Sequence, residues 1–303
     1  MQKTYFELDE DFNKIILKNL EDVEKIRLIP TGWTNIVFEV TTENNKSYFF
    51  RFPRDEFWAR TIVKDYQFAK YIHNKTDFDT VELQLLYDKG RPFSMHRKIE
   101  GTPLAERMNE LNESEIENIS SEIAKFMFQL HSIKYEKDKI FTINNIGVNL
   151  TEFLDELLKK HVSKDDMAFW NFRDEDKNHL SCLVHGDLNS SNVLLNNDNH
   201  VTAIIDFGFG GFGNKYDDIS RIIGRCPNNF KEEIIKNYEK YSKEKIEKRA
   251  ELWYNRRNLN GSGNGRRGES HGPVYFNGRT GWIRQNTADG FAAERIGGTG
   301  IFG

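Results

Sequence analysis

The segment Val184–Phe209, which reads VHGDLNSSNVLLNNDNHVTAIIDFGF, carries most of the information about fold class. Asp187 is followed five positions later by Asn192, and an apolar run then ends in a second aspartate, Asp206. Phosphoryl transfer from a nucleoside triphosphate needs a positioned hydroxyl, a bound metal and a cradle for the phosphates. Asp187 can accept the proton of an attacking hydroxyl, while Asn192 and Asp206 offer oxygen atoms to Mg²⁺.

A turn-rich loop is the alternative interpretation of this segment, because Gly, Asn and Ser favour turns by themselves. A His-Gly-Asp or an Asp-Phe-Gly tripeptide is weak evidence when it stands alone. Here the two occur in order, with one short β-like pair between them. That order favours a kinase-like phosphotransferase that moves a phosphoryl group onto the hydroxyl of a small molecule.

Whole-chain composition places the protein among globular proteins. The 303 residues are 38% hydrophobic and 30% charged, enough for one large domain or two lobes. A net charge of −4 gives no argument for nucleic acid or an anionic membrane surface as partner. The two cysteines, Cys182 and Cys226, form no CxxC pair, and no apolar run approaches the ~18 residues of a membrane span. We expect a soluble, cytoplasmic monomer.

Two β-rich stretches and one helix are predicted in the first third of the chain. Alternating apolar residues over 24–53, with a polar turn at 43–46, predict an antiparallel meander. Apolar side chains at steps of three and four predict a helix over 57–73. A second strand pair is expected over 81–99, turning at Lys89-Gly90.

Beyond Pro103 the pattern becomes mostly helical. Ser114 and Glu117 have the spacing of a capping box, which predicts the start of a helix that ends near residue 133. The remaining predicted elements are helices over 150–162, 217–223 and 230–241 and short strands over 193–195 and 203–207. We therefore predict an α+β fold with a small antiparallel β lobe, residues 1–99, and a larger, mainly helical lobe, residues 100–254.

The composition changes abruptly at residue 255. The last 49 residues hold 12 of the 22 glycines and no lysine, although lysine is frequent before them. We interpret residues 255–303 as an atypical Gly-rich tail without a core of its own, or as a foreign or frame-altered terminus. We assign this tail no function.

The two motifs around Asp187 and Asp206 resemble those of the bacterial aminoglycoside phosphotransferase family, within the choline-kinase-like small-molecule kinases. The resemblance covers roughly residues 28–250. It implies a two-lobed protein-kinase-like fold, ATP or GTP as phosphoryl donor, and Mg²⁺ as cofactor. It also implies that Asp187 is the catalytic aspartate and that Asn192 and Asp206 are the metal ligands. Asp218 matches a family aspartate that is more often a structural hydrogen-bond acceptor than a catalyst.

The resemblance extends to the predicted small lobe, with departures. Gly32 and Thr34 lie where the family has its nucleotide-covering turn, although one glycine falls short of a GxGxxG loop. Arg51 occupies the position of the usual phosphate-binding lysine, and Asp65 that of the partner glutamate. Arg54 is a second candidate cation. Guanidinium and ammonium differ in geometry, so this departure bears on the efficiency of nucleotide use more than on the fold. A surface charge on an edge strand is the alternative interpretation of Arg51.

The run from Met95 to Leu104 resembles the hinge between the two lobes. By this resemblance the purine hydrogen-bonds backbone groups near Arg97 and Ile99. Side chains in this run do not distinguish adenine from guanine.

The resemblance also implies that the acceptor is a cationic aminoglycoside and that its phosphorylation confers antibiotic resistance. The ammonium groups would face acids of the large lobe, for which Glu152, Asp155, Glu156 and Asp217 are candidates; a solvated helix face explains the first three equally well. Two alternatives remain open. The acceptor could be choline, a sugar or homoserine, or the chain could be a catalytically weak nucleotide-binding protein.

Overall fold

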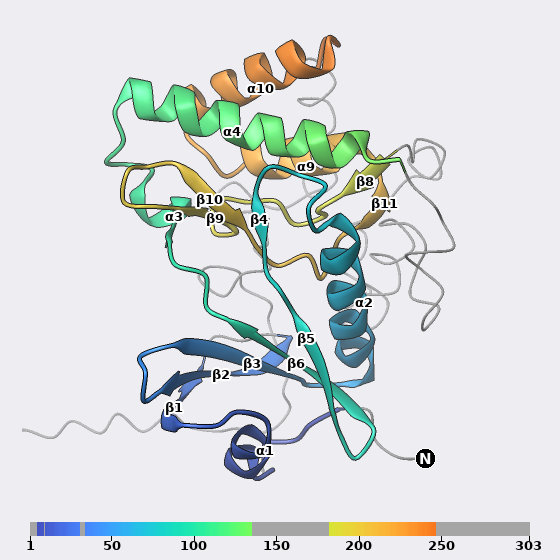
Figure 1. Ribbon diagram of the computed structural model, residues 1–303. Helices are drawn as coiled ribbons and strands as arrows, with labels where there is room; N and C mark the ends of the chain where they lie inside the picture. Colours follow the sequence, from blue (N-terminus) through green and yellow to red (C-terminus); the bar gives the residue numbers. More distant parts are fainter. Residues whose placement is uncertain (1–4, 9, 31–33, 135–181, 247–303) are drawn as a thin grey trace, which may run out of the picture. The chain divides into compact units, whose positions relative to one another are not determined.

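The computed structural model describes residues 5–8, 10–30, 34–134 and 182–246, which all belong to one compact unit, residues 1–265 (Figure 1). The described helices are α1 (Phe12–Asn19), α2 (Glu56–Ile72), α3 (Leu104–Arg107), α4 (Glu113–Ser132), α9 (Lys215–Ile223) and α10 (Asn228–Ser242). The predicted helix over 150–162 and the tail 255–303 lie outside the described residues.

An antiparallel sheet of five strands dominates the N-terminal third. Its strands are β1 (Val23–Ile29), β2 (Asn35–Thr42), β3 (Ser47–Pro53), β5 (Gln84–Asp88) and β6 (Arg91–Arg97). The spatial order β1-β2-β3-β6-β5 joins the predicted meander to the predicted second hairpin through β3 and β6. Asn45 and the pair Lys89-Gly90 make the hairpin turns with positive φ angles, which Asn and Gly tolerate better than most residues.

The two faces of β3 have different surroundings, because successive side chains of a strand point to opposite sides. Phe50 and Phe52 are fully buried in an aromatic core with Phe93 of β6 and Phe12 of α1. The rings of Phe12 and Phe52 lie 4.9 Å apart. Arg51, between the two phenylalanines, points to the opposite face, where α2 packs against β3 and β6.

The second part of the described chain contains short strands and a helical core. The strands are β4 (Asp79–Thr80), β7 (Thr102–Pro103), β8 (Cys182–Val184), β9 (Val193–Leu195), β10 (Val201–Ile204) and β11 (Gly211–Gly213). Helices α4 and α10 pack side by side (Figure 1), and their apolar faces contribute Ile123, Phe126 and Ile234 to a core that also contains Phe207. None of the described helices is both long and apolar enough to cross a membrane.

One predicted helix start is wrong by two residues. The capping box of α4 is formed by Asn112 and Glu115, not by Ser114 and Glu117. The Asn112 side chain accepts from the N–H of Glu115 at 3.0 Å, and the Glu115 carboxylate accepts from the N–H of Asn112 at 2.8 Å. This reciprocal pair satisfies N–H groups that would otherwise be unpaired, so the helix begins at Glu113.

Candidate active site

A strand ladder brings Asn192 and Asp206 to the same end of a small sheet. Strands β9 and β10 are antiparallel, and Val193 pairs with Ile204. Asn192 directly precedes β9 and Asp206 follows β10 by two residues, so both lie just beyond this pair. The N–H of Ile205 donates to the carbonyl of Asn192 at 3.0 Å, which continues the ladder by one more step.

Asp206 has a left-handed backbone conformation, with φ at +67°. The predicted strand 203–207 therefore ends earlier, at Ile204, because an extended strand cannot continue through this conformation. Such a strained non-glycine backbone is typical of functional sites. Burial raises the pKa of Asp206 above its ordinary value, and the neighbouring Asp187 carboxylate raises it further, while Arg51, His185 and the N–H of Gly208 partly offset both effects.

Asn192 and Asp187 are joined by a hydrogen bond within one tight loop. The Asn192 Nδ2 group donates to the carbonyl oxygen of Asp187 at 2.9 Å, and Asn189 Nδ2 donates to the same oxygen at 2.8 Å. Because Nδ2 is used in this bond, Oδ1 is the Asn192 atom that is available to a cation. Both Asp187 and Asn192 are buried, so the loop is held from several sides.

His185 connects this loop to the segment that carries Asp206. Its Nε2 lies 3.0 Å from the carbonyl oxygen of Ile205, and its Nδ1 lies 3.2 Å from the backbone N of Asp187. A carbonyl can only accept and an N–H can only donate, so the Nε2–H tautomer satisfies both contacts. The imidazole also packs against the ring of Phe207 at 4.6 Å.

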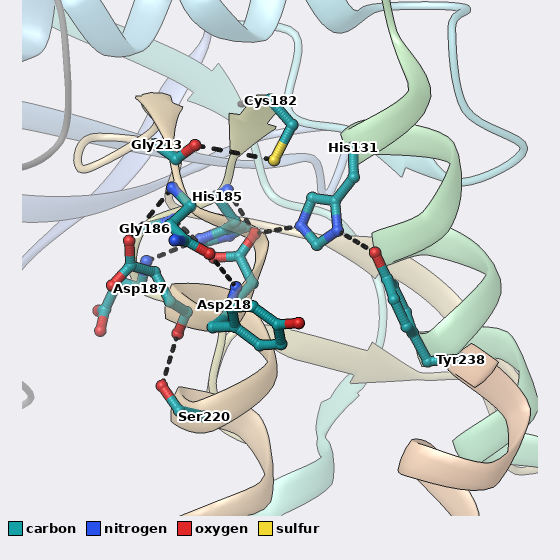
Figure 2. A network of polar contacts seen from close by, with 12 residues as sticks. His131, Cys182, His185, Gly186, Asp187, Gly213, Asp218, Ser220 and Tyr238 are labelled. Carbon is teal, nitrogen blue, oxygen red and sulfur yellow. Dashed lines mark hydrogen bonds and ion pairs between the residues drawn. The ribbon is translucent and has the colours of Figure 1, made fainter. Parts of the chain in front are cut away.

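The buried carboxylate of Asp218 holds the backbone of the same loop (Figure 2). Its two oxygens accept from the N–H groups of His185 and Gly186, each at 2.8 Å. The Nε2 of His131 on α4 lies 3.2 Å from Asp218, and the Nδ1 of His131 lies 2.7 Å from the hydroxyl of Tyr238 on α10. Burial opposes the charge of Asp218, but the hydrogen bonds from His131 and from the backbone hold its pKa below the ordinary value. This geometry agrees with the structural role expected for Asp218.

Arg51 pairs with the predicted acid, Asp65. Its Nη2 lies 2.5 Å from Oδ2 of Asp65, and its Nε donates to the hydroxyl of Ser94 at 3.0 Å. Register explains the second contact, since Arg51 and Ser94 face each other across β3 and β6. Burial opposes the charge of Arg51, but the carboxylates of Asp65 and Asp206 raise its pKa. Arg51 is thus within electrostatic reach of the Asp206 segment.

The other small-lobe candidates are less informative. Gly32 lies outside the described residues. The Thr34 carbonyl accepts from the N–H of Arg54 at 3.2 Å, which closes the end of the β2–β3 hairpin. Arg97 has an exposed side chain at the end of β6, and its carbonyl accepts from Nδ1 of His96 at 3.0 Å. Ile99 is half-buried just beyond β6.

Among the candidate acceptor-binding acids, Glu152, Asp155 and Glu156 lie outside the described residues. The fourth, Asp217, is buried, and its carboxylate accepts from the N–H of Asn214 in the capping box of α9. Sequence reasoning also missed Arg221 on the same helix. Its Nη1 donates to Oδ1 of Asp187 at 2.9 Å, a contact between positions 34 residues apart that carries no local signal.

Comparison with known proteins identifies the family. The sequence profile of the phosphotransferase enzyme family matches residues 25–252. The chain belongs to this family. The resemblance stated from the sequence is thereby confirmed, and the matched residues include all three predicted catalytic and metal-binding positions.

Solved structures of other phosphotransferases share the fold. The chain matches ADP-bound aminoglycoside phosphotransferase APH(2'')-Ib with a TM-score of 0.60 at 20% identity, over 84% of this chain and 88% of that one. For the gentamicin complex of APH(2")-IIa the TM-score is 0.61 at 20% identity, over 84% and 87%. For macrolide 2'-phosphotransferase MphH from Brachybacterium faecium it is 0.53 at 13% identity, over 75% and 81%. The predicted α+β kinase-like fold is confirmed.

The side chains of this phosphotransferase fit a magnesium ion that would also be held by phosphate oxygens. No group of three or more His, Cys, Asp and Glu side chains within residues 5–134 and 182–246, apart from the gaps at 9 and 31–33, forms a metal site. Mg²⁺ in phosphoryl-transfer sites usually takes one or two carboxylates and substrate phosphates. Asp206 and the Oδ1 of Asn192 supply oxygen donors of this kind at one end of the β9–β10 ladder.

Replacing Asp206 by Asn should stabilise the phosphotransferase without nucleotide at pH 7. Because the pKa of Asp206 is raised in the folded state, the folded protein loses stability as the pH rises from the ordinary aspartate pKa toward the raised one, and the full loss is present above it. We expect Asp206→Asn to raise the melting temperature at pH 7, and the gain to shrink as the pH falls toward 4. Differential scanning fluorimetry between pH 4 and 8 measures this.

Asp198→Asn is the matched control, because Asp198 is exposed in the β9–β10 turn. A melting temperature for Asp206→Asn that is lower than wild type at pH 7 and independent of pH would contradict the electrostatic account of this site.

Proposed function

We propose that this chain transfers the γ-phosphoryl group of ATP or GTP to a hydroxyl of an aminoglycoside antibiotic and thereby confers resistance. The observation that carries the proposal is the convergence of Asp187, Asn192 and Asp206 on one buried loop and one strand end, with Arg51 within electrostatic reach of Asp206. Supporting the choice of acceptor, similar structures are described as complexes with streptomycin, gentamicin or kanamycin.

In this proposal Asp187 receives the proton of the attacking hydroxyl. The loop that carries it is fixed by the hydrogen bonds that the N–H groups of His185 and Gly186 donate to Asp218, so the loop does not need to be ordered when the acceptor binds. A general base of this kind contributes about 10²–10⁴-fold to the rate. Positioning and charge stabilisation supply most of the remainder in phosphoryl transfer.

Asn192 and Asp206 would hold Mg²⁺, which neutralises the charge of the phosphates when it is bound. Arg51 would contact the α- and β-phosphates while Asp65 orients its guanidinium. Gly32 and Thr34 would cover the phosphates from the β2 end, and backbone groups near Arg97 and Ile99 would hydrogen-bond the purine. The Arg97 carbonyl already accepts from His96, so the purine would share this oxygen or use the neighbouring N–H groups.

Asp187→Asn should lower kcat by about 10²–10⁴-fold with little change in the KM for nucleotide, because the amide keeps the shape but cannot take the proton. A coupled assay of nucleoside diphosphate release, run separately with ATP and GTP over an aminoglycoside panel, measures this. The panel should also contain a macrolide, choline, a sugar and homoserine. Asp198→Asn serves as the matched control.

Turnover of one of those other acceptors, with no aminoglycoside phosphorylated, would replace the proposed substrate class but keep the chemistry. Nucleotide binding with no turnover, unchanged by Asp187→Asn, would contradict the proposed chemistry and favour a nucleotide-binding protein.

Arg51 and Asp65 should behave as a coupled pair in nucleotide binding. Arg51→Lys removes the contact to Ser94 and shortens the reach to Asp65, so we expect the KM for nucleotide to rise about 10-fold. Adding Asp65→Glu lengthens the acid and should recover part of this loss, although Asp65→Glu alone should be harmful. A double-mutant cycle on nucleotide KM measures the coupling. Additive effects would show that Arg51 acts without Asp65.

A further inference from the structure

Arg221 donates a hydrogen bond to the aspartate that the proposed reaction uses as a base. The Nη1 of Arg221 lies 2.9 Å from Oδ1 of Asp187, and the two side chains are 11% and 4% exposed. A charge-assisted hydrogen bond that is buried from water is stronger than one on the surface. The contact therefore limits how the Asp187 carboxylate can rotate.

The position of Arg221 on α9 places it on the same helix face as Asp218. The two residues are three positions apart, and side chains at that spacing are neighbours on a helix. Asp218 accepts from the backbone N–H groups of His185 and Gly186, and Arg221 donates to the side chain of the next residue, Asp187. One helix face thus holds both the backbone and the carboxylate of this loop.

The two oxygens of Asp187 have different surroundings. Oδ1 accepts from Arg221, whereas Oδ2 has no hydrogen-bond or ion-pair partner within the part of the chain that the structure describes. A carboxylate held by one oxygen presents the other in a fixed direction. Oδ2 is therefore already oriented when the attacking hydroxyl arrives.

A purely structural role explains the pair poorly. Burying a guanidinium is costly unless its donors are satisfied, and arginine–carboxylate pairs are frequently bidentate. Here one Nη atom contacts one oxygen, and the buried Nε of Arg221 finds no acceptor among the described residues. Oδ2 of Asp187 is thereby left without a partner among the described residues, and the ion pair is weaker than a bidentate one would be.

The pair also completes a pattern of charge around the two aspartates. Arg51 lies within electrostatic reach of Asp206, and Arg221 contacts Asp187. Asp187 and Asp206 are themselves close enough to influence each other. Asp187 therefore has a cation in direct contact, whereas Asp206 has one within electrostatic reach, since the guanidinium of Arg51 is bonded to Asp65.

We propose that Arg221 is a positioning residue for phosphoryl transfer, holding Oδ1 of Asp187 so that Oδ2 receives the proton of the acceptor hydroxyl. This inference rests on the proposed function. Because the hydrogen bond acts on the base and touches neither nucleotide nor acceptor, its loss affects the chemical step rather than binding. Misplacing a reactive group by about 1 Å can lower a rate by about 10²-fold.

The test compares Arg221→Met and Arg221→Lys with wild type. We expect Arg221→Met to lower kcat by roughly 10- to 100-fold while the KM values for nucleotide and acceptor stay within about twofold. Arg221→Lys should recover part of kcat, because it keeps a charged donor but loses the planar geometry. Lys236→Met, at an exposed position of α10, is the control for replacing a cation by methionine.

Melting temperatures and steady-state constants separate the positioning role from a structural one. A kcat unchanged by Arg221→Met, a loss confined to KM, or a loss matched by the fraction of unfolded protein would each overturn the inference. Crystal structures of wild type and Arg221→Met supply a measurement independent of turnover. A displaced Asp187 carboxylate in the variant is expected, and an unmoved one would overturn the inference.

These measurements also keep the inference distinct from the proposed function. If wild type phosphorylates no acceptor, the proposed function fails, and the position of the Asp187 carboxylate in the two crystal structures still decides whether Arg221 holds it.

Discussion

The buried carboxylate of Asp218 is the constraint on which the rest of the site depends. A charged group with no exposed surface is tolerated only when hydrogen bonds replace its lost water. Two backbone N–H groups and the His131 imidazole supply those bonds, and Tyr238 fixes the imidazole in turn. Helices α4, α9 and α10 therefore contact the loop that carries Asp187 through one carboxylate.

His185 links the loop that Asp218 holds to the segment that carries Asp206. Its ring accepts from the loop backbone on one side and donates to Ile205 on the other, so the two motifs of the sequence are tied together directly. The neighbouring Phe207 contacts Phe68 of α2 and Phe126 of α4. Helix α2 also carries Asp65, whose bond to Arg51 extends the same connection to the sheet of the small lobe.

The sequence predicted the parts of this arrangement that depend on local spacing. Alternation and turn residues located the strands around Arg51, and the order of the two aspartate motifs located Asp187, Asn192 and Asp206. The loop–strand–strand segment that contains them is short enough for spacing to fix their mutual arrangement. The lobe boundaries at residues 99 and 254 remain predictions.

Features formed between distant positions could not be predicted in this way. The bond from Arg221 to Asp187 and the chain from Asp218 through His131 to Tyr238 depend on how helices pack, which periodicity does not reveal. Both Asn112 and Ser114 are good helix caps by residue type. The structure uses Asn112, which forms the reciprocal hydrogen bonds with Glu115. Asp217 was a candidate for binding the acceptor because it is an acid of the large lobe. In the structure its carboxylate takes part in the capping box of α9.

We propose that Asp187, Asn192 and Asp206 together form one site for a magnesium-bound nucleoside triphosphate. A crystal structure with Mg²⁺ and a non-hydrolysable triphosphate tests it most directly. The account predicts a metal ion bound by the Oδ1 of Asn192 and the carboxylate of Asp206, with the terminal phosphate facing Asp187. A triphosphate whose metal ion contacts neither Asn192 nor Asp206 would contradict it.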